Sequence, residues 1–230
     1  MTDPKRHFHE ELAQLKERLL HMSSLAEDAL ARAVRALLDR DAAAADKVVQ
    51  DDRRIDALEI EMDDTVTNLL ALHQPMARDL RLVLAALKTA DDLERVGDHA
   101  VNIAQAARRL LAYRVIAPEP EVVEMARLAR EMLASALEAF VRGDSKAGRD
   151  VCARDDEVDR LNQSLFRILI THMAEDPHVI GAAMQVFLVG RNLERVADLA
   201  TNIAENVVFL VEGKSIKHHI EDHPEGGTTS

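Results

Sequence analysis

Four pairs of acidic side chains, each with its members four residues apart, form the pattern in this chain that could do chemistry. The pairs are Asp52 and Asp56, Glu94 and Asp98, Asp155 and Asp159, and Glu194 and Asp198. Residues four apart lie on one face of an α-helix, where two carboxylates repel by about 0.2–0.5 kcal/mol. Carboxylate oxygens are also the ligands that hard cations prefer, so the repeated pattern suggests cation binding.

Two of these pairs belong to an internal repeat. Residues 93–104 read LERVGDHAVNIA and residues 193–204 read LERVADLATNIA, so nine of the twelve positions are identical at a spacing of one hundred. A repeat of this length indicates two copies of one structural unit. Each copy also carries an asparagine, Asn102 or Asn202, two helical turns beyond its glutamate.

The composition predicts a helical protein. Among 230 residues there are only 8 Gly and 6 Pro, whereas 47% of the residues are hydrophobic and 3% are aromatic. The net charge of −12 argues against nucleic acid as a partner, because a phosphate backbone binds a basic surface. Cys152 is the one cysteine, which fits a reducing compartment, and no segment has a signal-like apolar core. We therefore expect a cytoplasmic protein.

Apolar residues at a spacing of three or four predict six helices, at about residues 3–38, 42–73, 76–113, 121–141, 146–173 and 178–211. Prolines 75, 118, 120 and 177 separate several of them. The expected fold is all-α, with two tandem three-helix bundles. Residues 1–116 form the first bundle, residues 117–213 the second, and residues 214–230 a disordered tail.

Turn positions predict which acids face each other. The chain turns between Gln74 and Pro75 in the first unit and between Asp176 and Pro177 in the second. In each unit one acidic pair precedes the turn, and another follows it, by about the same number of residues. Because short connections make neighbouring helices antiparallel and each residue rises about 1.5 Å, the two pairs should lie at one level. Each bundle should then hold four carboxylates together.

Two interpretations of these carboxylates stay open from the spacing alone. The first is a set of ion pairs with nearby arginines, namely Arg53, Arg54, Arg95, Arg154 and Arg195. Arg95 and Arg195 project about 100° away from the adjacent glutamates, so they reach them less well.

The second interpretation is a pair of metal sites made of oxygen ligands. They would hold divalent or trivalent Mg, Mn, Fe or Ca, with more than one ion in each bundle. The weaker additional ligands are Glu59, Asn102, Asn162 and Asn202.

Patterns of other chemistry are missing from the sequence. There is no Cys/His zinc pattern, no glycine loop for phosphate and no credible Ser/His/Asp arrangement. The one Glu-x-x-His sequence, from Glu175 to His178, contains Pro177, which argues against a di-iron carboxylate oxidase. We therefore do not expect an enzyme. A helical adaptor without functional metal is the main alternative.

The doubled Leu-Glu-Arg-Val-x-Asp-x-x-x-Asn-Ile segment resembles the PhoU family, as does Gln-Pro-x-x-x-Asp-Leu-Arg at residues 74–81. The resemblance spans about residues 8–213. It implies an accessory regulator of bacterial phosphate transport, built of two three-helix bundles with multinuclear metal clusters on the Glu/Asp-x-x-x-Asp motifs. One departure is His99, which stands where the second copy has Leu199, so the two sites are expected to differ in metal preference.

The resemblance also implies a role and partners. The role would be to repress the phosphate-starvation response and restrain uptake when phosphate is plentiful. The partners would be the membrane-bound phosphate-sensing histidine kinase and the ATPase subunit of the phosphate ABC transporter. Contact with the membrane would be peripheral, through these partners only, and a homodimer is one assembly that the chain could form.

Overall fold

The structure is a computed structural model that describes residues 4–113 and 119–216, with side chains from residue 7. Within these residues every regular element is a helix, which confirms the all-α expectation. The elements are α1 (Pro4–Asp39), α2 (Ala42–Asp51), α3 (Arg53–His73), α4 (Ala77–Leu110), α5 (Pro120–Arg142), α6 (Ser145–Cys152), α7 (Asp155–Glu175), the 3₁₀ turn η1 (Pro177–Val179) and α8 (Ile180–Glu212).

Two of the predicted helices are interrupted. The predicted helix at 42–73 consists of α2 and α3, and the predicted helix at 146–173 consists of α6 and α7. At both breaks a backbone N–H bonds to the carbonyl three residues earlier, from Ile55 to Asp52 and from Arg154 to Val151. Such a tightened turn interrupts the α-helical pattern without reversing the chain. Both breaks lie at the first acid of a predicted pair, beside Asp52 and just before Asp155.

Local chemistry explains where the helices begin and end. The Asp41 carboxylate accepts hydrogen bonds from two backbone N–H groups at the start of α2, and Asp144 does the same for α6. Gly143 and Gly213 end α5 and α8 in the left-handed conformation, with φ of 63° and 72°. These local interactions begin α2 and α6 and end α5 and α8.

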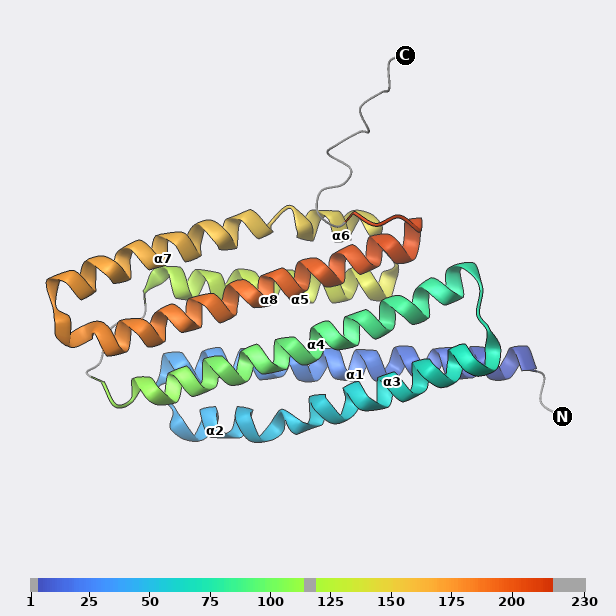
Figure 1. Cartoon of the computed structure of the whole chain (residues 1–230), viewed down its shortest axis with the longest axis horizontal. Helices are drawn as coiled ribbons and strands as arrows, with labels where there is room; N and C mark the ends of the chain where they lie inside the picture. Colours follow the sequence, from blue (N-terminus) through green and yellow to red (C-terminus); the bar gives the residue numbers. More distant parts are fainter. Residues whose placement is uncertain (1–3, 114–118, 217–230) are drawn as a thin grey trace, which may run out of the picture.

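The two units are arranged around α4 and α8, which run antiparallel through the middle of the molecule (Figure 1). In this view α3, α4, α8 and α7 lie side by side, while α1 and α5 lie behind them. The Arg81 Nε donates to the Leu210 carbonyl across the two units at 3.2 Å. The predicted boundary at residues 116–117 lies outside the described residues, as do residues 217–230 of the predicted tail, so both stay predictions.

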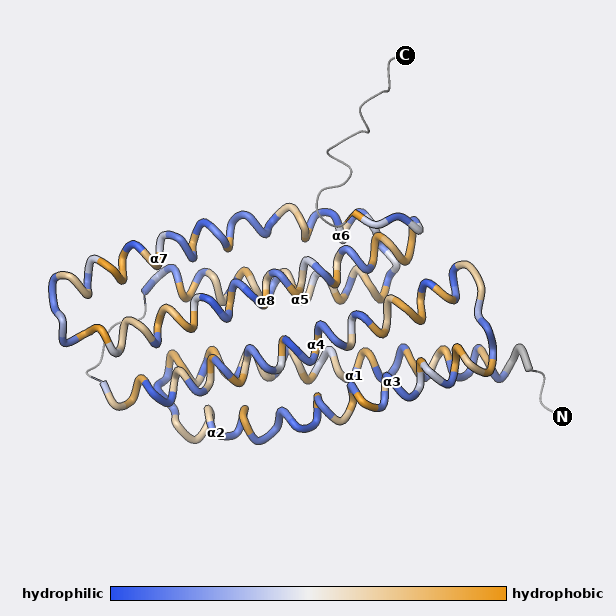
Figure 2. Tube along the Cα trace, in the orientation of Figure 1, coloured by the Kyte–Doolittle hydropathy of each residue, from blue (hydrophilic) through white to orange (hydrophobic). Residues whose placement is uncertain are grey.

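The core is aliphatic and contains the apolar positions of the repeated segment. These positions are fully buried in both copies, at Leu93, Val96 and Ile103 and at Leu193, Val196 and Ile203. Apolar and polar residues are interspersed along every helix (Figure 2). In the repeated segments the leucines are buried, whereas the paired acids of α4 and α8 are partly or fully exposed. In the part of the chain that the structure describes, no helix has both the length and the apolarity needed to cross a bilayer.

Candidate metal sites at two acidic clusters

The first acidic cluster lies between α3 and α4. Its carboxylates are Asp52, Asp56, Glu59, Asp63, Asp91, Glu94 and Asp98. Burial, together with the neighbouring carboxylates, of which Asp98 acts most strongly, raises the pKa of Glu94 to about 7. Burial also raises the pKa of Asp52 to about 6, with added repulsion from Asp56 and Asp98. The neighbouring charges that raise these two pKa values are all carboxylates, and among the described residues neither group has an ion pair that would compensate its charge.

A glycine allows the two helices of this cluster to approach. The Asp52 Oδ1 lies 2.9 Å from the position that a Cβ would take on Gly97, and the Ile55 Cδ1 lies at 3.0 Å. Real Cβ atoms essentially never come closer than 3.0 Å to such a contacting atom, so the absence of a side chain lets Asp52 rest against the α4 backbone. The second copy has Ala197 at this position.

The second acidic cluster lies between α7 and α8. Its carboxylates are Asp155, Asp156, Asp159, Glu194 and Asp198. Burial raises the pKa of Asp155 to about 6, with added repulsion first from Asp198 and then from Asp159. Two arginines partly neutralise this cluster: Arg191 lies 2.6 Å from Glu194, and Arg195 lies 2.9 Å from Asp198.

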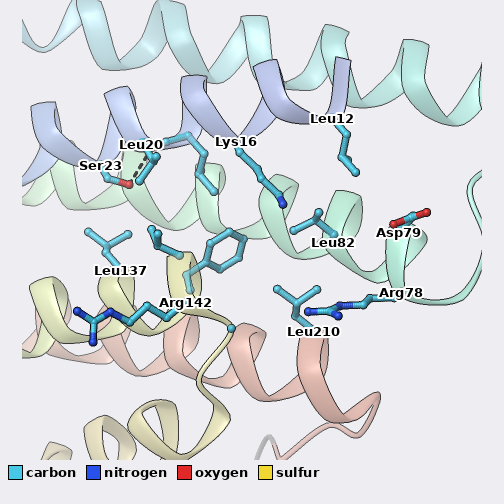
Figure 3. A pocket seen from close by; sticks show the side chains of 14 residues that line it. Leu12, Lys16, Leu20, Ser23, Arg78, Asp79, Leu82, Leu137, Arg142 and Leu210 are labelled. Atoms are coloured by element: carbon cyan, nitrogen blue, oxygen red, sulfur yellow. Dashed lines mark hydrogen bonds between the residues drawn. The ribbon is translucent and has the colours of Figure 1, made fainter. Parts of the chain in front are cut away.

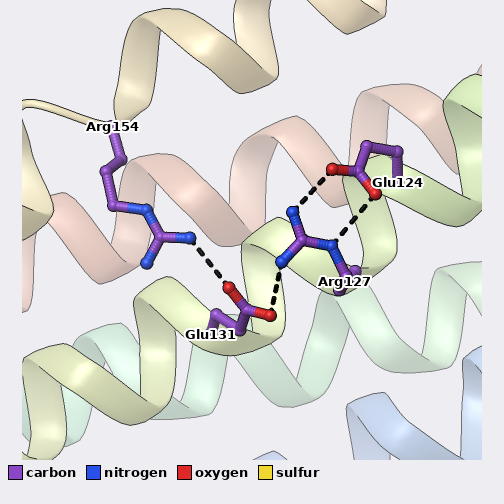
Figure 4. Close-up of polar contacts among 4 residues, drawn as sticks. All are labelled: Glu124, Arg127, Glu131 and Arg154. Atoms are coloured by element: carbon purple, nitrogen blue, oxygen red, sulfur yellow. Dashed lines mark hydrogen bonds and ion pairs between the residues drawn. The ribbon is translucent and has the colours of Figure 1, made fainter.

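The ion-pair interpretation therefore fits part of the second cluster and none of the first. Arg195 reaches the aspartate three residues on, not the adjacent glutamate. Arg95 lies 4.0 Å from Asp92 instead of pairing with Glu94. Arg154 points away from the acids and donates to Glu131 of α5 at 2.9 Å, in a network with Arg127 (Figure 4). Arg53 and Arg54 are exposed and form no ion pair with any described residue.

The weaker candidate ligands have different surroundings. Glu59 belongs to the first cluster, where burial and then Asp63 raise its pKa. The Asn162 Oδ1 is buried without a hydrogen-bond partner and lies 3.3 Å from the place of a Cβ on Gly190, one turn before Glu194. This unsatisfied oxygen suits an additional ligand of the second cluster.

Two residues of the repeated segments contact the other unit. The Asn202 Nδ2 donates to the buried Asp92 of α4 at 3.4 Å. The His99 Nδ1 lies 2.9 Å from the Asn192 Oδ1 of α8, so its contact is at the interface between the units. Asn102 is exposed. These contacts give Asn202 and His99 a packing role, and they do not support a difference in metal preference caused by His99.

The donor set of both clusters fits a hard cation, although a complete coordination shell is not preformed. In the described ranges, no three His, Cys, Asp or Glu side chains converge closely enough to hold a metal ion. Carboxylates that repel one another stay apart until a cation offsets their charge. The oxygen-only donors, the excess negative charge and the orphaned Asn162 oxygen fit Mg²⁺, Mn²⁺, Ca²⁺ or iron. The eight main ligands stay a prediction.

Several charged residues of the clusters were not predicted from the sequence, and two of them make the clusters differ in charge. Asp91 adds a carboxylate to the first cluster, and Arg191 pairs with Glu194 in the second. They occupy equivalent positions of the two copies, two residues before the repeated twelve. Extending the comparison of the copies upstream would have found both, and with them the charge difference between the clusters.

Comparisons with known proteins agree with the fold and the repeat. The family model described as "PhoU domain" matches residues 19–107 and 122–207. A phosphate-specific transport system accessory protein PhoU homolog from Zymomonas mobilis is 39% identical over 209 residues, which cover 91% of this chain and 88% of that protein. The crystal structure of PhoU from Pseudomonas aeruginosa aligns with a TM-score of 0.87 and 36% identity, over 90% of this chain and all of that one.

A second solved structure gives the same result. The phosphate transport system regulatory protein PhoU from Streptococcus pneumoniae aligns with a TM-score of 0.85 and 29% identity. It covers 91% of this chain and 99% of that chain. Because the family model matches both units and the identities extend over most of the sequence, this chain belongs to the PhoU family.

Proposed function

We propose that this chain is a metal-binding accessory protein of phosphate transport that acts by docking to other proteins. The observation that carries the metal part is the first acidic cluster, where carboxylates of two helices lie together and no described residue forms an ion pair with Glu94 or Asp52. The regulatory part is supported by the names of the relatives, which describe accessory and regulatory proteins and no enzyme.

The proposed partners are the membrane-bound phosphate-sensing histidine kinase and the ATPase subunit of the phosphate ABC transporter. Docking to them would repress the starvation response and restrain uptake when phosphate is plentiful. The net charge of −12 gives the molecule a field that orients a basic partner surface. In this proposal the chain is cytoplasmic and reaches the membrane only through its partners.

Bound cations would change the charge of the surface formed by α3, α4, α8 and α7. Asp52, Asp56, Glu94 and Asp98 would hold the ions of the first cluster, and Asp155, Asp159, Glu194 and Asp198 those of the second. A cation supplies positive charge that offsets the repulsion among these carboxylates. Because both clusters lie along helices of this one layer (Figure 1), occupancy would weaken the negative field that a partner meets there.

Thermal unfolding tests the metal part. A ligand that binds the folded state at 100 times its Kd stabilises it by about 2.7 kcal/mol, so Mn²⁺ or Mg²⁺ should raise the Tm of untagged protein. Replacing Asp98 and Asp198 by Asn should remove this rise, whereas Asp150→Asn, at an exposed position outside both clusters, should keep it. A wild-type Tm that is the same in chelator and in excess Mn²⁺ would contradict metal binding.

Cells and membranes test the docking part. A strain that lacks the protein should express phosphate-scavenging genes and import phosphate in phosphate-rich medium. The purified protein should retain the kinase or the transporter ATPase from solubilised membranes, and chelator should change the amount retained. Normal repression in the deletion strain, together with no retention of either partner, would refute the proposed regulation whatever the metal result.

The second candidate function is a helical adaptor without functional metal. The ion pairs of Arg191 and Arg195 favour it for the second cluster, since they already offset part of the charge. Docking without any effect of metal or chelator would support it. An oxidase has no support, because Glu175 ends α7 and His178 lies in the 3₁₀ turn beyond Asp176, which has extended dihedrals.

A further inference from the structure

A cleft of about 440 Å³ lies between the two units, away from the acidic clusters. Its walls come from α1, the start of α4, the end of α5 and the end of α8 (Figure 3). The apolar lining includes Leu12, Leu19, Leu82, Leu137, Phe140 and Leu210. Leu20 and Val141 line the same cleft and are 48% and 59% exposed, so apolar surface continues to its mouth.

The charges around this cleft oppose the charge of the whole chain. Lys16, Arg78 and Arg142 line it against one acid, Asp79, in a protein of net charge −12. Arg142 pairs with Glu138 at 2.7 Å, whereas Lys16 and Arg78 have no ion pair among the described residues. Figure 3 shows Lys16 reaching from α1 toward the cleft and Arg78 lying beside Leu210. Two cations are therefore free to meet a negative group.

The neighbouring polar groups have other hydrogen-bond partners, so they do not occupy the Lys16 and Arg78 cations. The Ser23 hydroxyl, which also lines the cleft, donates to the Leu19 carbonyl at 2.8 Å. The carbonyl of Leu210, near the end of α8, accepts from Arg81. Arg78 lies in the first turn of α4, whose positive dipole end adds to the attraction for an anion.

We propose that this cleft binds a single-chain amphiphile with an anionic head, such as an acyl carboxylate or an alkyl phosphate. The aliphatic lining takes the chain, and Lys16 and Arg78 take the head. The volume lies in the range of pockets for drug-sized molecules, which favours one free chain over a two-chain phospholipid. This inference does not rest on metal binding or on the proposed partners.

Competition with a fluorescent fatty acid tests the proposal. Dansyl-labelled undecanoate should bind saturably below its micelle concentration. Dodecanoate and dodecyl phosphate should displace it. Inorganic phosphate, which lacks the tail, and dodecyltrimethylammonium, which has the opposite charge, should not. Equal displacement by the anionic and cationic amphiphiles would overturn the assignment of the head site.

Variants locate the binding. The double variant Lys16→Ala, Arg78→Ala should raise the Kd of the probe about tenfold, a modest loss because both cations are exposed. Arg35→Ala removes an exposed cation of the same helix, α1, and should leave the Kd unchanged. Leu82→Trp should block the cleft. If circular dichroism shows that this variant is unfolded, Leu20→Trp at the exposed mouth replaces it.

Three further outcomes would overturn the proposal. The first is a probe Kd that none of the cleft variants changes. The second is displacement only by phosphatidylglycerol vesicles with cosedimentation of the protein, which would mean a membrane surface in place of a free amphiphile. The third is self-association, measured by analytical ultracentrifugation, that the Lys16 and Arg78 variants abolish, which would mean that a second copy covers the cleft.

Discussion

Replacing Gly97 by Ala should separate the stability of the first unit from its response to cations. Gly97 lies inside α4, and a Cβ there would be 2.9 Å from the Asp52 Oδ1 and 3.0 Å from the Ile55 Cδ1. Ordinary contacts begin at 3.4 Å, so the Asp52 oxygen must move by about 0.5 Å, the difference between 3.4 and 2.9 Å, to restore one. Both contacting atoms are the ends of flexible side chains, so they can move without displacing a helix.

Two effects set the size of the change in stability. Alanine is favoured over glycine in a helix interior by about 1 kcal/mol. The movement of Asp52 and of the buried Ile55 takes back part of that gain. The free energy of unfolding of the metal-free protein should therefore rise by between zero and about 1 kcal/mol, which for a chain of this size raises the Tm by up to about 2–4 °C.

The rise in Tm that cations cause should be smaller in Gly97→Ala, because Asp52 would be displaced from the other acids. Thermal unfolding in chelator and in a series of Mn²⁺ concentrations measures both quantities. Ala197→Gly is the matched control in the second copy, where we expect a lower Tm and an unchanged response of the first cluster. Two results would contradict these expectations. The first is a full Mn²⁺ response in Gly97→Ala together with its loss in Asp52→Asn, and the second is a Tm of Gly97→Ala in chelator that is several degrees lower than that of the wild type.

Three other perturbations have defined outcomes. Burial is the largest cause that raises the pKa of Glu94 from 4.5 to about 7. In chelator, the unfolded state therefore loses this proton at a lower pH than the folded state, and the free energy of unfolding falls as the pH rises between those values. In a series of urea-unfolding measurements at increasing pH, Glu94→Gln should flatten that fall. Burial raises the pKa of Cys152 to about 11, so the thiol of the native protein should react with a disulfide reagent at pH 8 far more slowly than the thiol in denaturant. Equal rates would contradict the burial of this thiol. Asp92→Ala leaves the buried Asn206 amide without its acceptor, at a cost of about 1–3 kcal/mol in the free energy of unfolding. Calorimetry should detect this loss as a lower Tm, and an unchanged Tm would show that the contact contributes nothing to stability.

The approximate positions of the helices could be predicted from the sequence, because the residues that begin and end a helix act locally. Prolines, the left-handed Gly143 and the cap at Asp144 fix helix ends through interactions of adjacent residues. The breaks at Asp52 and before Asp155 were not predicted. A single tightened turn keeps helical dihedrals, as at Asp52 with φ −54° and ψ −38°, and so barely disturbs the apolar spacing that the prediction uses.

For the acidic clusters, the height of the carboxylates along the helices was predictable from the sequence, but the arginines with which they pair were not. Antiparallel helices and a constant rise bring Asp52 near Asp98, and Asp155 near Asp198, whose charges act on each other. Which carboxylate an arginine meets depends on side-chain rotamers, so the contact between Arg195 and Asp198 did not follow from the spacing. The contact of His99 depends on how the units pack, which the repeat does not specify.

The two clusters should fill at different cation concentrations. A cation that enters the second cluster must displace Arg191 from Glu194 and Arg195 from Asp198, whereas in the first it only relieves repulsion around Glu94. Each displaced ion pair costs about 0–1 kcal/mol, so the second cluster should bind Mn²⁺ up to about thirtyfold more weakly. Calorimetric titration of Asp98→Asn should lack the tighter phase, and Arg191→Ala should strengthen the weaker one. Two phases that Arg191→Ala leaves unchanged would show that the arginines do not compete with the cation.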